Sequence, residues 1–267
     1  MIQIDIDSCY KTVMEAVESA SKIVLKGFEG TKHVDTKSAS WDLVTEYDSK
    51  TEELLIKTLS EAFPDHKFIG EETASKTKLT DEPTWIIDPI DGTTNFVHGI
   101  PYCCISIGLA ISREVVIGIV SCPPLNQIFT AIKGRGAFLN GKPIHVSKAE
   151  ELQNAVMGYE FSLGSRPELR ELFINRYRAL VAKAQGMRSF GSSQMQLCLV
   201  AMGSLDAYQV EFLWPWDVAA GSLIVTEAGG TVIDTDGGKF DCEKSRIIAT
   251  STKKLAEEIV EVLRTVS

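Results

Sequence analysis

The 267-residue chain lacks the sequence signatures of several large protein classes. No eighteen consecutive apolar residues occur, so no transmembrane helix is predicted. The first residues, Met1-Ile-Gln-Ile-Asp, have neither a basic start nor a continuous apolar run, so they do not read as a secretory signal. Internal repeats, low-complexity tracts and a Gly/Ser/Pro-rich linker are also missing. We therefore expect a cytoplasmic protein without a membrane partner.

Basic blocks and paired metal-binding motifs are equally scarce. The net charge is -9 and no stripe of Lys and Arg offsets it, which disfavours a nucleic-acid partner. The six cysteines form no C-x-x-C pair and most lie among apolar residues, so buried reduced thiols are expected. A zinc or iron centre is disfavoured because no histidine has a partner at ligand spacing: His33, His66, His98, His145.

What is present is an ordinary globular composition, with 44% hydrophobic and 24% charged residues. Residues 1–150 predict an α+β half: helices over 7–28 and 49–63, strands at 67–70 and 84–87, and an antiparallel stretch over 103–111, 115–121, 127–132 and 137–139. Residues 151–267 predict an α/β half: strands at 155–161, 207–212, 231–233 and 246–249, and helices over 167–183, 193–202, 217–228 and 253–266. The halves are expected to pack tightly, as one domain or two.

The segment Asp88-Pro-Ile-Asp-Gly-Thr-Thr-Asn-Phe96 is the most informative in the chain. Its two carboxylates and the Ile90 carbonyl are hard oxygen ligands suited to divalent cations. Taken alone, an Asp-x-x-Asp turn is more often a surface turn with capping residues. Other motifs must therefore decide between these two interpretations.

Two further motifs occur in order along the chain: Gly70-Glu-Glu72 upstream and Trp216-Asp-Val-Ala-Ala-Gly221 downstream. Together with the Asp88–Phe96 segment and with residues 42–48 and 226–230, these motifs resemble the inositol monophosphatase family over nearly the whole chain. The resemblance is greatest to animal members of the family. The resemblance implies a mixed α and β fold, the layered α-β-α-β-α sandwich shared with fructose-bisphosphatases. It also implies a homodimer.

The resemblance further implies the metal ligands. One Mg²⁺ would be bound by Glu71, Asp88 and the Ile90 carbonyl, and a second by Asp88, Asp91 and Asp217. Two or three Mg²⁺ ions per site are expected, with Li⁺ as an inhibitor. Taken singly, Glu71 reads as an exposed strand-end acid and Asp217 as a helix cap.

In the resembling enzymes a glutamate and a threonine hold the attacking water, and an aspartate orients the threonine. These residues are Glu71, Thr93 and Asp48 here. The implied substrate contacts are Asp91, Gly92, Thr93, Gly191, Ser192, Ser193, Asp217 and Lys37. From the residues alone, Gly191 could equally be a simple turn before a helix, and Lys37 a solvated lysine.

One position departs from the family pattern. Val210 stands where the family has a glutamate that hydrogen-bonds the inositol ring, and Glu211 follows one place later. Because a strand alternates faces, Glu211 should point away from the substrate unless a bulge restores it. Inositol specificity is therefore less securely predicted than phosphatase chemistry.

The predicted function is Mg²⁺-dependent hydrolysis of inositol monophosphate, a small phosphate monoester. Sugar phosphates, nucleotide bisphosphates and NADP are alternative substrates for the same chemistry. A non-catalytic regulatory or binding protein on this scaffold is an alternative of another class. The chain has no Gly-x-Ser-x-Gly, Cys-x5-Arg or P-loop motif that would indicate a different mechanism.

Overall fold

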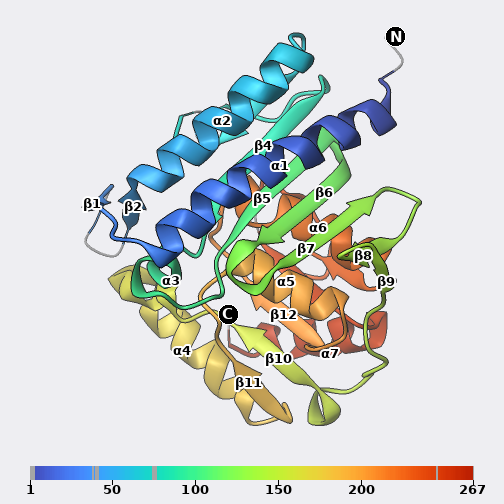
Figure 1. Cartoon of the computed structure of the whole chain (residues 1–267). Helices are drawn as coiled ribbons and strands as arrows, with labels where there is room; N and C mark the ends of the chain where they lie inside the picture. Colours follow the sequence, from blue (N-terminus) through green and yellow to red (C-terminus); the bar gives the residue numbers. More distant parts are fainter. Residues whose placement is uncertain (1–3, 38, 40–41, 74–76, 245, 267) are drawn as a thin grey trace.

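The computed structural model describes residues 4–37, 39, 42–73, 77–244 and 246–266. Within these residues two β-sheets alternate with three layers of helices (Figure 1). The order of layers is helices α1 and α2, a seven-stranded sheet, helices α5 and α6, a five-stranded sheet, and helices α4 and α7. This arrangement confirms the predicted α-β-α-β-α sandwich.

The larger sheet has the strand order β3-β4-β5-β6-β7-β8-β9. Its strands β3 and β4 are parallel, and every later neighbour is antiparallel. Helix α3 lies between β4 and β5, whereas short turns join the later antiparallel neighbours from β5 to β9. The strand bounds are β3 (Lys67–Gly70), β4 (Thr84–Asp91), β5 (Cys104–Ile111), β6 (Glu114–Cys122), β7 (Gln127–Ile132), β8 (Ala137–Leu139) and β9 (Lys142–Ile144).

The smaller sheet has the order β11-β10-β12-β14-β13. Strands β11, β10 and β12 run parallel, while β14 is antiparallel to both of its neighbours. The carboxyl ends of the three parallel strands therefore meet at one edge of the sheet, where ligands commonly bind in such folds. The bounds are β10 (Val156–Tyr159), β11 (Gly186–Arg188), β12 (Ala207–Val210), β13 (Thr231–Ile233) and β14 (Ile247–Thr250).

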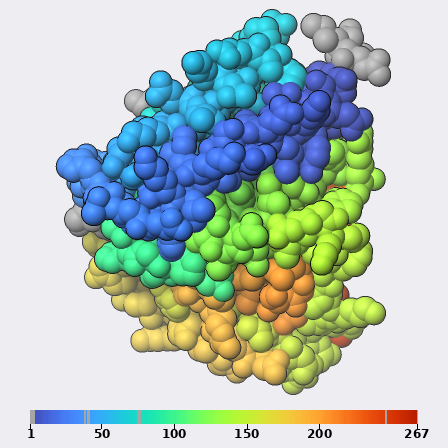
Figure 2. All heavy atoms as spheres, viewed as in Figure 1, coloured from blue at the N-terminus to red at the C-terminus, as the bar shows by residue number. Residues whose placement is uncertain are grey.

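Helices α1 and α2 cover the outer face of the larger sheet and dominate the surface in the view of Figure 2. Helix α1 begins where the Asp5 carboxylate accepts the backbone N–H groups of Asp7 and Ser8. Its buried stripe includes Val13, Val17 and Val24, as the helical spacing predicts. The helix bounds are α1 (Ile6–Glu29), α2 (Glu46–Ala62), α3 (Thr93–His98), α4 (Pro167–Val181), α5 (Ser193–Ala201), α6 (Ala219–Glu227) and α7 (Lys253–Arg264).

The inner helices α5 and α6 lie between the two sheets and are buried on nearly all sides. The apolar cluster around them draws on both predicted halves, with Val120 and Phe129 from the first and Leu197 and Ile224 from the second. The two halves thus share this cluster, while a second apolar cluster belongs to the first half alone. Their division near residue 150 stays a prediction.

The predicted elements are present, with ends displaced by a few residues. Four short strands were not predicted: β9, β11, and a separate hairpin of β1 (Val34–Thr36) and β2 (Leu43–Thr45). All three residues of β1 are exposed, so this strand has no apolar alternation by which a sequence could reveal it. Short 3₁₀ turns complete the fold: η1 (Pro123–Leu125), η2 (Leu152–Asn154), η3 (Ser162–Ser165) and η4 (Pro215–Asp217).

Candidate active site

Strand β4 carries two of the predicted metal ligands at its carboxyl end. Residues three apart on a regular strand face opposite sides, yet the register with β5 shifts between Asp88 and Asp91. Three steps on β4 correspond to two on β5, because Asp88 pairs with Ser106 and Asp91 with Cys104. This bulge turns both carboxylates toward the same place.

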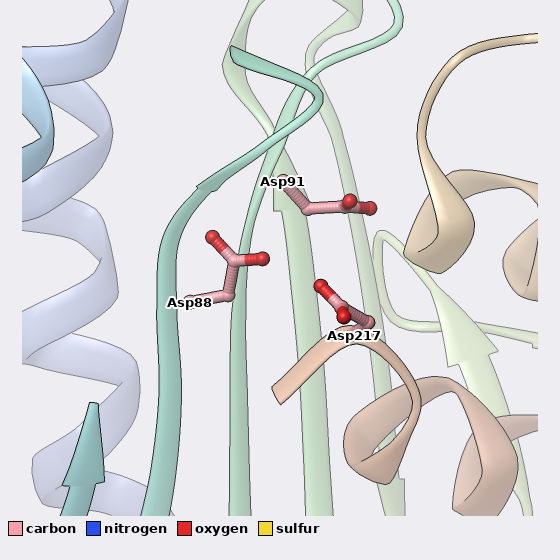
Figure 3. Close-up of side chains that lie close together, drawn as sticks. All are labelled: Asp88, Asp91 and Asp217. Carbon is pink, nitrogen blue, oxygen red and sulfur yellow. The ribbon is translucent and has the colours of Figure 1, made fainter. Parts of the chain in front are cut away.

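The third carboxylate comes from the far end of the chain. Turn η4 places Asp217 opposite β4, where its Oδ2 accepts the Trp214 backbone N–H at 2.7 Å. One carboxylate oxygen from each of Asp88, Asp91 and Asp217 lies within 4.8 Å of the other two. Figure 3 shows the three side chains close together. Hard oxygen ligands at such spacing suit a divalent cation of the Mg²⁺ type.

Burial raises the pKa of each of these carboxyl groups. Asp88 and Asp91 are 1% and 8% exposed. Burial and then the charges of Glu71 and Asp91 raise the pKa of Asp88 well above its ordinary value. Burial raises the pKa of Asp91 to about 6 against hydrogen bonds that lower it, and burial followed by the Asp91 charge raises that of Asp217. Negative charges that repel one another in this way are stabilised by a bound cation, so the residues fit a metal centre.

Glu71 and Lys37 meet at the end of β3. The Lys37 ammonium lies 2.7 Å from a Glu71 carboxylate oxygen and 2.6 Å from one of Glu72. Burial alone would lower the pKa of Lys37, but these two carboxylates raise it. Burial raises the pKa of Glu72 to about 7, partly offset by Lys37. The lysine thus neutralises the acidic segment next to the aspartate cluster.

Asp48 and Thr93 occupy helix starts in this structure. The Asp48 carboxylate accepts the Thr45 backbone N–H at 2.8 Å and the Thr45 hydroxyl at 2.6 Å, forming the capping box of α2. Burial raises the pKa of Asp48 to about 6, against these bonds. The Thr93 hydroxyl donates to the Ile90 carbonyl at 3.1 Å. The orienting role of Asp48 toward Thr93 stays a prediction.

The predicted substrate-binding glycines are brought together from distant parts of the chain. Gly92 precedes α3 with φ of 89°, and a Cβ there would lie 3.1 Å from the Gly191 carbonyl oxygen. The Asp91 Oδ2 accepts the Ser192 hydroxyl at 2.6 Å and the Gln194 backbone N–H at 2.7 Å. The Ser193 backbone N–H lies 3.4 Å from the Asp91 Oδ1. The predicted metal ligand and the predicted substrate turn are therefore directly hydrogen-bonded.

Strand β12 keeps its alternation through Glu211. Tyr208 donates its hydroxyl to Ser193 of α5 at 3.2 Å, and Val210 lies on the same face and is fully buried. Glu211 faces the opposite layer, where its carboxylate pairs with Arg176 of α4 and accepts the Thr235 hydroxyl. The structure thus agrees that Glu211 points away from Ser193, although it lies in a buried ion pair and not in solvent.

Two buried glutamates near the site were not singled out from the sequence. Glu52 of α2 accepts the backbone N–H groups of Glu72 and Thr73, so it fixes the segment that follows Glu71. Glu160 follows β10 and accepts the Gly191 backbone N–H at 3.1 Å. Both were detectable: Glu52 lies on the apolar face of its helix, and Glu160 lies one residue before the end of the strand predicted over 155–161.

The layered fold and the buried carboxylate cluster define a metal-dependent phosphatase. A family model described as the inositol monophosphatase family matches residues 5–267, and the chain belongs to that family. It is 47% identical to inositol monophosphatase 2 of Solanum lycopersicum, over 89% of this chain and 91% of the relative. It is 42% identical to inositol monophosphatase 2 of Homo sapiens, over 98% and 92%.

Solved structures of similar proteins have the same fold. The extragenic suppressor protein SuhB of Bartonella henselae superposes with a TM-score of 0.86 at 30% identity, covering 96% of this chain and 98% of that one. An inositol monophosphatase of Thermotoga maritima superposes with a TM-score of 0.85 at 29% identity, covering 97% and 98%. Among the described residues, none of the helices is both long and apolar enough to span a membrane.

Proposed function

We propose that the chain hydrolyses inositol monophosphate to inositol and inorganic phosphate with Mg²⁺ as its cofactor. The observation that carries this proposal is the convergence of Asp88, Asp91 and Asp217 within 4.8 Å. Two or three Mg²⁺ ions held by these residues, Glu71 and the Ile90 carbonyl would neutralise the phosphoryl oxygens and stabilise the leaving alkoxide.

The chain's own residues would do the remaining work. Glu71 would accept a proton from the attacking water once the Lys37 ammonium, 2.7 Å away, moves aside. Thr93 would help to hold that water, with its hydroxyl redirected from the Ile90 carbonyl toward Asp48. Direct transfer to water requires no covalent intermediate on the protein. Gly92 and the turn at Gly191 would receive the phosphate and the ring.

The proposal is tested by phosphate release from inositol 1-phosphate. Activity should vanish in chelator, return with added Mg²⁺ and fall again with Li⁺. Full turnover without metal would refute the mechanism. A tightly bound but unhydrolysed ester would instead favour a non-catalytic binding protein.

A second candidate substrate is a nucleotide phosphate. Val210 provides no carboxylate for ring hydroxyls, and the Trp214 side chain next to Asp217 is 56% exposed. Its indole stacks on that of Trp216 with centroids 5.4 Å apart and 11° between the planes. A related staphylococcal enzyme has been solved with 2'-AMP bound, at a TM-score of 0.81 and 27% identity. Comparing kcat/KM for 2'-AMP and inositol 1-phosphate distinguishes the candidates.

We also propose a homodimer with two-fold symmetry and a cytoplasmic location. The homodimer is the assembly that the family resemblance implies. All six cysteines are free and buried, as expected for reduced thiols. A monomer by light scattering at micromolar concentration would refute the dimer.

A further inference from the structure

Glu160 directly follows β10, whose last residue Tyr159 pairs with Gln209, the residue before Val210, on the parallel neighbour β12. The side chain before it, Tyr159, points toward α4, since its hydroxyl donates to a carbonyl of that helix. Strand alternation therefore directs Glu160 to the opposite side, toward α5. Gln196 of α5 donates to it at 3.1 Å. The buried Glu160 carboxylate therefore lies on the same side of the smaller sheet as Val210, the position at which the resemblance predicts a glutamate.

The Glu160 carboxylate is held by five neutral donors while being only 8% exposed. A buried carboxylate is stable only when hydrogen bonds replace its lost hydration. The donors are the backbone N–H groups of Phe161 (3.0 Å), Ser162 (3.2 Å) and Gly191 (3.1 Å), the Ser189 hydroxyl (3.3 Å) and the Gln196 amide (3.1 Å). Two of these donors belong to the turn that links β11 to α5.

That turn, residues 189–192, is anchored by three side chains. Asn95 donates to the Phe190 carbonyl at 2.6 Å, and Asp91 accepts the hydroxyl of the residue that precedes α5. Glu160 completes the set by accepting the Gly191 N–H. Gly191 has φ of 72°, and a Cβ there would lie 2.9 Å from the Asn95 side chain. These contacts restrict the position of the turn, which is held by the predicted metal ligand Asp91 at one end and by Glu160 at Gly191.

We propose that Glu160 is a positioning residue for the leaving group of the substrate. This inference rests on the proposed phosphatase function. Because the Gly191 N–H is occupied by Glu160, the turn meets the substrate in a fixed orientation with its remaining polar groups. Releasing that N–H lets the turn shift relative to Asp91 and weakens contacts to a ring, whereas groups that bind only phosphate keep their places.

The test compares a ring substrate with an acyclic one. Glu160→Ala should raise KM for inositol 1-phosphate about tenfold, the value of one hydrogen bond to a charged group, relative to KM for glycerol 2-phosphate. The kcat values and the Mg²⁺ concentration for half-maximal activity should stay within about twofold of the wild type. Glu160→Gln keeps one acceptor oxygen and should give an intermediate KM.

Glu211→Gln is the matched control, because Glu211 is also a buried glutamate next to Val210 but faces α4. It should lower Tm without changing the KM ratio of the two substrates. The inference is overturned if Glu160→Ala changes both KM values equally, leaves both unchanged, or if Glu211→Gln shifts the ratio as much. If the wild-type protein releases no phosphate from either ester, the proposed function itself fails.

Discussion

The candidate site has two groups of residues with different expected tasks. The metal side is our name for the acidic group Asp88, Asp91, Asp217 and Glu71, and the leaving-group side is our name for Glu160, Gly191, Val210 and Trp214. The metal side holds the four side chains that the family resemblance predicts as metal ligands. The leaving-group side has Val210 where the resemblance predicts a glutamate, and it exposes an indole at Trp214. We therefore expect separate residues to catalyse the reaction and to select the substrate. Every phosphate ester needs its charge neutralised, whereas only some esters have a ring to bind.

The largest effect is expected at Asp88, because both predicted metal ions would share it as a ligand. Asp88→Asn should lower kcat by more than about a thousandfold for every ester, since catalysis here depends on electrostatic stabilisation. The protein should still fold, because the change removes one of several negative charges that repel one another. In chelator its Tm should equal or exceed that of the wild type.

Asp81→Asn serves as the control, because Asp81 is an exposed acid far from the cluster in the ion pair with Arg113. It should leave kcat unchanged. Substantial turnover by Asp88→Asn with any ester would show that the metal side is not where the reaction is catalysed.

The metal side should also couple stability to pH. Burial raises the pKa of Asp91 from 3.8 to about 6, and that of Asp48 likewise to about 6. An acid with a raised pKa in the folded state binds its proton more tightly there than in the unfolded chain. The metal-free protein is therefore expected to lose stability as pH rises from about 4 through about 6.

Because Mg²⁺ binds the ionised carboxylates, the stabilisation that it provides should grow over the same pH interval. Thermal unfolding in chelator and in Mg²⁺, at pH 5 and pH 7.5, measures both effects. A Tm in chelator that rises between these pH values, or an Mg²⁺ effect that is larger at pH 5, would contradict the assignment of the cluster.

The metal side was also the part that sequence could predict. Three motifs predicted that Asp88, Asp91 and Asp217 act together, and their carboxylates do converge, while metal binding by them stays a prediction. Apolar periodicity predicted the helices and strands, and the family resemblance predicted their layered arrangement. The bulge that aligns Asp88 with Asp91 could not be predicted, because it depends on the register with β5. Likewise the occupation of the Gly191 N–H by Glu160 is a tertiary contact between residues 31 positions apart.

At Glu211 the sequence predicted the direction of a side chain but not its partner. Strand alternation correctly gave its face but not its partner, because Arg176 lies on a different element. Removing one member of a buried ion pair leaves the other charge unpaired, so Glu211→Ala should cost about 3–5 kcal/mol of stability. It should leave the KM for inositol 1-phosphate unchanged. Denaturant unfolding together with steady-state kinetics separates the two effects.

A glutamate at position 210, as the resemblance predicts for the family, tests whether this position contacts the ring of the substrate. Val210→Glu should lower KM for inositol 1-phosphate about tenfold, because a carboxylate acceptor adds a charge-assisted hydrogen bond to the ring. Val210→Gln has nearly the same shape without the charge and should give a smaller decrease. Since Val210 is fully buried, Tm must be measured alongside. Equal KM values for Val210→Glu and the wild type would mean that the ring does not reach β12.

The smallest effect is expected at Trp214, whose exposed indole stacks on buried Trp216. Trp214→Ala should lower kcat/KM for 2'-AMP about fivefold relative to inositol 1-phosphate, the lower range for base stacking on an aromatic side chain. Trp214→Phe keeps an aromatic face and should lose less. Phe161→Ala removes a similarly exposed ring that packs on Tyr159 and Tyr177, so it should not change the ratio. If all three variants preserve the wild-type ratio, the indole does not contact the leaving group, and substrate choice depends on β10 and β12 alone.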